Sequence, residues 1–469
     1  MVSVAGVCSF CAFPGASLVS IAFLALVFIA TGALYERTGI ASRTGWYTLF
    51  SAMVLLSLGF AANVWYFTVC SGGTPADPVL NNNDAYVAWR HIIEVRTGEP
   101  FVGDLFDTGA SRQGYGVLMG WLSAVLGLDI GTLLVVNVFA VLMTIVLSGM
   151  IAVELIGTDA DDQSRRSIGG LAMLMTAAIC YFLASGVILI KDALSCMTMA
   201  LFVYGVLRMR CQAFEDSIRF RTVTSAVVAA ALLLAFQIRP NFLPMMILGF
   251  IILGSYKRRS SLYACMAGSV LAAGLYYISE AMLDTAPSFT ALATHSEDII
   301  DENSARLDGY TSVVGGYIGK PFYAKLLQLP VSAAVQFLTP LPWGFTKHIV
   351  FGPSQIWSHV SYPWYAVGGM AIYYMLFCLR RSPDMLARTC CYGVLLTLIT
   401  AYATGGTISR YCLPWLPLLV PAAVWVWMNR RGEKSFRIYA VVYVVLMAVV
   451  LFGVWYLDMS SASGGASVK

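Results

Sequence analysis

Charged residues are scarce in this sequence. Asp, Glu, Lys and Arg together make up 12% of the 469 residues, whereas soluble domains carry about a quarter. Hydrophobic residues make up 59% and the mean hydropathy is +0.75, so a soluble globular protein is excluded. The net charge of +4 is small and comes from short loops, and it gives no sign of a nucleic-acid partner.

Motifs of soluble enzymes and of metal sites are also missing. The sequence has no Walker A loop, no G-x-G-x-x-G, no H-E-x-x-H and no nucleophile elbow, so ATP-driven transport by this chain has no support. Nearly all of the 11 cysteines lie within apolar runs. Cys8 and Cys11 form a C-x-x-C without a second pair, and we interpret them as small hydrophobic residues rather than zinc ligands.

Long apolar runs are abundant instead. One membrane helix needs about 20 apolar residues, and the sequence supplies about twelve such segments. We therefore predict an all-α polytopic membrane protein in which residues 1–469 form a single integral membrane domain. The predicted spans are 17–35, 46–69, 130–156, 168–188, 193–208, 222–238, 241–256, 261–281, 364–380, 389–404, 411–428 and 438–457.

The positions of Lys and Arg predict the orientation, because cytoplasmic loops are enriched in both. Six short loops that share one side hold 18 of the 29 basic residues, and we assign them to the cytoplasm. None of them is long enough to fold into a domain, so we expect any chemistry at the outer face. These inner loops are 35–45, 157–167, 208–221, 257–260, 380–388 and 429–437.

Two long segments then fall on the outer side, at 70–128 and 282–363. Within the first, residues 114–128 are too short for a span, and within the second, residues 329–350 are interrupted by prolines. We interpret both pieces as helices that lie in the outer interface or dip partway into the membrane.

The first outer segment contains a candidate catalytic acid. Apolar residues follow Asp84 at helical spacing, which predicts an amphipathic helix that begins at Asp84 and lies at the outer interface. An aspartate at this position can cap the helix and, equally, can act as a general base at the membrane surface. The predicted buried face consists of Ala85, Ala88, Trp89, Ile92 and Ile93.

Three predicted outer turns each present a cation. Lys191 and Asp192 interrupt an apolar stretch, and ionisable residues at membrane depth are costly and therefore functional candidates. Arg239 and Arg410 occupy equivalent turns. Each could simply be a solvated turn, but three cations that converge on one site would suit a lipid bearing phosphate.

At this point the order of motifs resembles the membrane glycosyltransferases of the GT-C superfamily, especially bacterial relatives of the protein O-mannosyltransferase and lipid A aminoarabinose transferase families. The similar segments are Asp84 to Tyr86, residues 112–119 (RQGYGVLM), 126–129 (LGLD), 134–137 (LVVN) and 409–417 (SRYCLPWLP). This resemblance implies a GT-C-like fold in a bacterial inner membrane, with the active site facing the periplasm. It also adds candidate substrate-binding residues, which are Tyr86, Arg90, Arg112 and Tyr411.

The resemblance implies inverting transfer of a sugar from a polyprenyl-phosphate donor to a glycan, lipid or protein acceptor. Nucleotide sugars stay in the cytoplasm, so an outward site needs a donor that a lipid delivers. Asp84 would accept the proton of the attacking hydroxyl, and the cations would stabilise the departing phosphate. The scheme requires no covalent intermediate and implies no definite cofactor, although Asp192 could orient the acceptor or a divalent cation.

Two alternatives stay open. The Lys191–Asp192 pair and residues 337–343 (FLTPLPW) also resemble polysaccharide polymerases or ligases, which use polyprenyl-diphosphate donors. A transporter or flippase would need polar residues through to the cytoplasmic side, and the inner halves of the predicted spans are nearly free of charge. The sequence also lacks the internal repeat that many transporters show.

Overall fold

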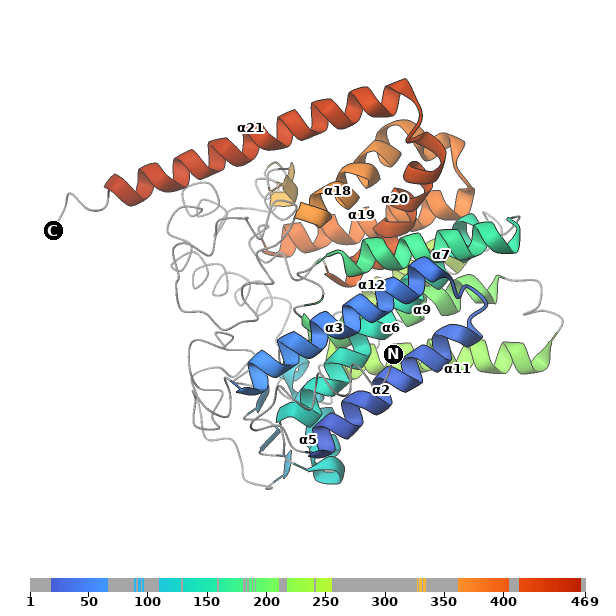
Figure 1. Ribbon diagram of the computed structural model, residues 1–469, viewed down its shortest axis with the longest axis vertical. Coiled ribbons are helices and arrows are strands. Elements are labelled where there is room, and N and C mark those ends of the chain that lie inside the picture. Colours follow the sequence, from blue (N-terminus) through green and yellow to red (C-terminus); the bar gives the residue numbers. More distant parts are fainter. Residues whose placement is uncertain are drawn as a thin grey trace.

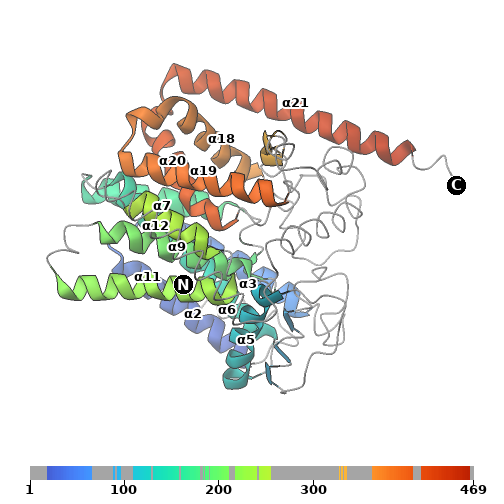
Figure 2. The same ribbon diagram turned by 180° about the vertical axis from the view of Figure 1, so that it is seen from behind.

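A computed structural model gives the fold (Figures 1 and 2). At a few helix positions, 109–114 among them, only the backbone is described. The structure describes residues 18–65, 88–89, 92–93, 95–96, 109–127, 130–157, 160–179, 183, 185–187, 189, 191–210, 217–239, 242–254, 327, 329–330, 332–334, 362–404 and 413–464.

The described part of the chain is helical throughout its regular elements. A π-helical turn, Tyr374–Cys378, and a 3₁₀ turn, Leu379–Arg381, extend α18. The α-helices are α2 (Leu18–Arg37), α3 (Arg43–Trp65), α5 (Gly109–Leu126), α6 (Ile130–Ile156), α7 (Asp162–Ala177), α9 (Asp192–Met209), α11 (Ile218–Ile238), α12 (Phe242–Gly254), α18 (Tyr362–Tyr373), α19 (Asp384–Thr404), α20 (Leu416–Arg430) and α21 (Lys434–Gly464).

Seven helices within the described residues are long and apolar enough to cross a membrane, namely α2, α3, α6, α9, α11, α19 and α21. This confirms the all-helical character of the part of the chain that the structure describes, and it makes a multi-pass membrane protein plausible. The full number of about twelve spans and the GT-C arrangement stay predictions. One predicted span, 261–281, lies outside the described residues.

Helix α6 forms the centre of the bundle. It packs against α2, α3, α7 and α9, and 89% of its most apolar window is buried. Helix α21 is the least buried of the seven, since only 6% of its apolar window is buried. It runs along the edge of the bundle beside α18 (Figure 1). An apolar helix that exposes this much of its surface is suited to lipid as its surroundings.

The turns that carry the basic residues gather at one end of the bundle, at the right of Figure 1 and the left of Figure 2. At this end α2 leads into α3, α6 into α7, α9 towards α11, α18 into α19, and α20 into α21. These connections coincide with five of the six predicted inner loops, including 157–167. The grouping on one side is therefore confirmed for these loops, whereas their assignment to the cytoplasm stays a prediction.

The predicted span 168–188 is wrong as a single helix. Helix α7 ends at Ala177 after 16 residues, which corresponds to about 24 Å and is short of the roughly 30 Å hydrocarbon core. The helix breaks at Ala178 and Ile179, whereas Leu183 and Ser185 are helical again; the Gly186 amide then closes a turn by donating to the Leu183 carbonyl over 3.0 Å. Hydropathy alone did not reveal this break, because the residues after the break are as apolar as those before it and are buried as well.

A side chain from another helix holds this irregular segment in place. The Asn63 amide on α3 donates to the Val187 carbonyl over 2.6 Å, and Asn63 is buried. A Cβ on Gly186 would lie 2.9 Å from the side chains of Leu56 and Val141, so the backbone approaches α3 and α6 closely. Non-helical backbone at membrane depth is tolerated where protein buries it in this way.

The helix predicted after Asp84 is confirmed as helical at its described positions, whereas its location at the membrane interface stays a prediction. Residues 88–89, 92–93 and 95–96 are helical, and the side chains of Ala88, Trp89 and Ile92 are buried as the periodicity indicates. The segment lies against α5, because the Arg96 guanidinium donates to the Ser123 carbonyl over 3.1 Å.

Both predicted outer segments contain further helix. Helix α5 ends before Gly127, whose φ of 98° needs the conformational freedom of glycine. In the second outer segment, residues 327, 329–330 and 332–334 are helical. The predicted half helices thus have helical character where the structure describes them, whereas their depth in the membrane stays a prediction.

Candidate functional site

Asp192 and Arg239 form an ion pair inside the protein, between the Arg239 Nη2 and the Asp192 Oδ1. Their side chains are 2% and 11% exposed, so water reaches neither freely. Asp192 opens α9 and Arg239 follows α11, and the two helices pack against each other. The pair lies at the opposite end of α9 from the basic turns, which is the end predicted to face outward (Figures 1 and 2).

The local sequence explains both positions. Pro240 follows Arg239, and a proline disfavours helical backbone in the residue before it, so α11 ends with Arg239 at φ −149° and ψ 86°. Asp192 lies in the first turn of α9, where a carboxylate interacts favourably with the positive end of the helix dipole. Lys191 is the N-cap of this helix and is half-buried. Two helix ends therefore bring three ionisable groups together.

An aromatic ring also packs near the arginine. The Arg239 guanidinium carbon lies 5.4 Å from the centroid of the Phe242 ring, within the range of a cation–π contact. The Phe242 ring lies 5.1 Å from that of Trp415, centroid to centroid. The Trp415 indole in turn donates to the Thr400 hydroxyl over 3.0 Å. These contacts tie the junction between α19 and α20 to the end of α11.

Tyr115 and Asn137 complete the surroundings of Asp192. The Asn137 amide donates to the Tyr115 hydroxyl over 3.2 Å, and both residues are fully buried or nearly so. Cys196 lies one turn after Asp192 on α9 and is buried, and α5, which carries Tyr115, packs against α11. Both Tyr115 and Asn137 belong to motifs singled out in the sequence, but a neutral tyrosine and amide carry no charge signal, so neither was selected as a site residue.

The structure brings three of the predicted site residues together, namely Lys191, Asp192 and Arg239. Asp192 and Arg239 were assigned separate roles from the sequence, which did not predict that they pair. Arg112 lies on α5, one turn before Tyr115, and its side chain is not described. The remaining predicted site residues lie outside the described residues; they are Asp84, Tyr86, Arg90, Arg410 and Tyr411.

The chemistry of this site follows from its charges. The ion pair is neutral as a unit, and Lys191 adds one formal positive charge beside it. Among the described residues, no three His, Cys, Asp or Glu side chains gather in a way that could hold a metal ion. The described part of the site thus contains two basic groups and one acidic group.

Comparison with known protein families, with characterised proteins and with solved structures finds no match for this chain. The similarity to GT-C transferases accordingly rests on the sequence motifs alone.

Proposed function

We infer that the chain is an inverting glycosyltransferase that takes a sugar from a polyprenyl-phosphate donor at the outer face of a bacterial cell membrane. The observation that carries this proposal is the buried Asp192–Arg239 pair beside Lys191, at the end of the bundle opposite the basic turns. Burying an ion pair costs several kcal/mol of desolvation per ion, so its retention within an apolar bundle calls for a role beyond stability.

The reaction consists of one displacement. An acceptor hydroxyl attacks the anomeric carbon, a new carbon–oxygen bond forms, and the bond from that carbon to the phosphate oxygen breaks on the opposite face. Asp84 is the proposed base that takes the hydroxyl proton. The polyprenyl phosphate leaves with an additional negative charge, which nearby cations stabilise.

Lys191 and Arg239 are the proposed phosphate-binding groups, with Arg410 as the third. A guanidinium has five N–H donors in a planar fork, so one edge can hold a carboxylate while another binds a phosphate oxygen. In this arrangement Asp192 is a positioning residue, since it fixes the direction of the Arg239 fork. Lys191 supplies the positive charge that the ion pair itself lacks.

A transfer assay in membranes tests the reaction and the assigned base together. Membranes containing the wild type receive a polyprenyl-phosphate donor with a radiolabelled sugar, and label in the acceptor is counted. Asp84→Asn keeps the shape of the side chain but removes the base, so we expect a rate about 10²- to 10⁴-fold lower. Arg208→Gln is the control, because Arg208 pairs with Glu154 at the other end of α9.

Two outcomes would overturn the proposal. If Asp84→Asn transfers sugar as fast as the wild type and only diphosphate-linked glycans serve as donors, the chain is a polymerase or ligase. If no donor is consumed but labelled lipid changes leaflet, the chain is a flippase.

A further inference from the structure

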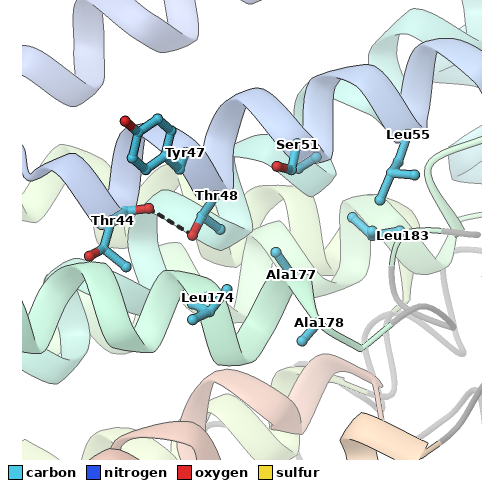
Figure 3. Close-up of a pocket in the computed structure, with 10 residues that line it drawn as sticks. Thr44, Tyr47, Thr48, Ser51, Leu55, Leu174, Ala177, Ala178 and Leu183 are labelled. Carbon is cyan, nitrogen blue, oxygen red and sulfur yellow. Dashed lines mark hydrogen bonds between the residues drawn. The ribbon is translucent and has the colours of Figure 1, made fainter.

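A groove of about 380 Å³ lies between α3, α7 and the turns that follow α7 (Figure 3). Tyr47, Ser51 and Leu55 of α3 form one wall, while Leu174 and Ala178 lie on the other. None of these residues belongs to the ion-pair site. The groove is therefore a separate feature at the flank of the bundle.

The α3 wall changes in polarity along its length. Arg43, Tyr47, Ser51 and Leu55 are spaced by four residues, so they share one face of the helix. The order from the basic end is cation, phenol, hydroxyl and aliphatic side chain. Arg43, Tyr47 and Ser51 are all exposed.

The α7 wall has the same direction. Arg166, Gly170, Leu174 and Ala178 are also spaced by four residues, and the arginine is again at the basic end and exposed. A Cβ on Gly170 would lie 3.2 Å from the Thr44 Cβ, so the two walls touch there. Neither Arg43 nor Arg166 lines the groove itself; each lies beyond it on its own helix, towards the end of the bundle where the basic turns gather.

Leu174 shows that the groove opens outward. Its side chain is 44% exposed, whereas its neighbours Met173 and Met175 are 0% and 8% exposed. From Ile168 onward α7 is otherwise largely buried among α3, α6 and α20. An aliphatic side chain exposed at membrane depth, between walls that turn polar towards the basic end, faces lipid rather than water.

We propose that this groove binds an anionic phospholipid from the leaflet that adjoins the basic turns. Arg43 and Arg166 contact the phosphate, the hydroxyls of Tyr47 and Ser51 face the glycerol and ester region, and one acyl chain lies along the aliphatic end. Among the described residues, the two turns at the mouth keep a net charge of +1, from Arg37, Arg43, Arg165 and Arg166 against Glu36, Asp161 and Asp162. This site does not depend on the proposed transferase activity.

The test measures lipid bound to the full-length protein. The purified wild type is placed in nanodiscs that contain phosphatidylglycerol and phosphatidylcholine, washed into detergent, and analysed by native mass spectrometry. We expect one retained phosphatidylglycerol. In the double variant Arg43→Gln/Arg166→Gln, its retention falls on the order of tenfold or more, as expected for two lost basic contacts at a membrane surface. The matched control is Arg219→Gln/Arg221→Gln, an exposed pair at the start of α11 near the same end.

A second variant separates the groove from its charged mouth. Ser51→Phe fills the middle of the groove and leaves both arginines in place, so retention of phosphatidylglycerol falls while the protein stays folded by circular dichroism. Equal retention in all variants overturns the site. If the α11 control loses phosphatidylglycerol to the same extent, the binding is a general attraction to basic surface residues and the groove is not a site. If the protein retains phosphatidylcholine or an isoprenoid lipid instead, the assigned anionic headgroup is wrong.

Discussion

The carboxylate of Asp192 and the guanidinium of Arg239 join the first turn of α9 to the residue that ends α11. Removing one member of such a buried pair leaves the other charge without compensation, whereas removing both does not. This asymmetry allows the stability of the fold to be separated from the chemistry of the site.

Each single substitution, Asp192→Leu or Arg239→Leu, is expected to lower the free energy of unfolding by about 3–5 kcal/mol. The double variant should recover most of this loss, because two apolar side chains replace both charges. Unfolding in mixed micelles, followed by circular dichroism, measures all three. A double variant that is stable yet inactive assigns the pair to function, and one that remains fully active would assign it to structure alone.

Asn63 is expected to control the irregular segment after α7. Asn63→Leu removes the donor to the Val187 carbonyl, and a buried carbonyl left without its donor costs about 1–3 kcal/mol. Hydrogen exchange should therefore accelerate around Val187 while α6 keeps its protection. Ser57→Ala is the comparison, since the Ser57 hydroxyl bonds only within its own helix, to the Met53 carbonyl. Identical exchange in both variants would contradict this role for Asn63.

The sequence predicts some features of this fold, such as the bounds of α6, and misses others, such as the end of α7. Hydropathy and periodicity predict the bounds of α6 exactly as observed, and they place Ala88, Trp89 and Ile92 on a buried face. They miss the end of α7 at Ala177, because the residues on both sides of it are equally apolar, and they cannot reveal the bond from Asn63 to Val187, which joins residues more than a hundred positions apart. Long-range contacts of this kind leave no trace in a local pattern.

In the candidate site too, the sequence identifies the charged residues but not the contacts between them. Charged residues in apolar surroundings stand out in the sequence, so Lys191, Asp192 and Arg239 were all selected. Their pairing could not be predicted, because it depends on how α9 and α11 pack. Tyr115 and Asn137 were missed as site residues for the reason that neutral polar groups are common within membrane helices.

A third prediction concerns the close packing of α12 against α19, which should not tolerate a larger residue at Gly249. A Cβ on Gly249 would lie 2.4 to 2.8 Å from the ring and hydroxyl atoms of Tyr392, whose hydroxyl donates to the Met245 carbonyl. Gly249→Ala should therefore displace the ring and lower stability by about 1–3 kcal/mol. Gly453→Ala on α21 meets nothing within 4 Å and should be neutral or slightly stabilising. Equal melting temperatures for the two variants would disprove the close contact.

Sidedness is testable with cysteine labelling. In a chain whose 11 native cysteines are replaced, Gly432→Cys marks the turn between α20 and α21, and Ser71→Cys marks the first outer segment. A membrane-impermeant maleimide should label position 71 in intact cells and position 432 only after permeabilisation. The reverse pattern would place the ion-pair site on the cytoplasmic side and exclude an outward-facing transferase.

The central claim is that cations at the outer end of the bundle stabilise a departing lipid phosphate. Purified protein in proteoliposomes, supplied with a radiolabelled polyprenyl-phosphate sugar and an acceptor extract, tests it most directly through the initial rate of transfer. Lys191→Gln should lower kcat by about 10²- to 10³-fold, as the loss of one transition-state contact does, and Arg208→Gln should keep the wild-type rate. No transfer by the wild type, or equal rates in wild type and Lys191→Gln, would contradict the claim.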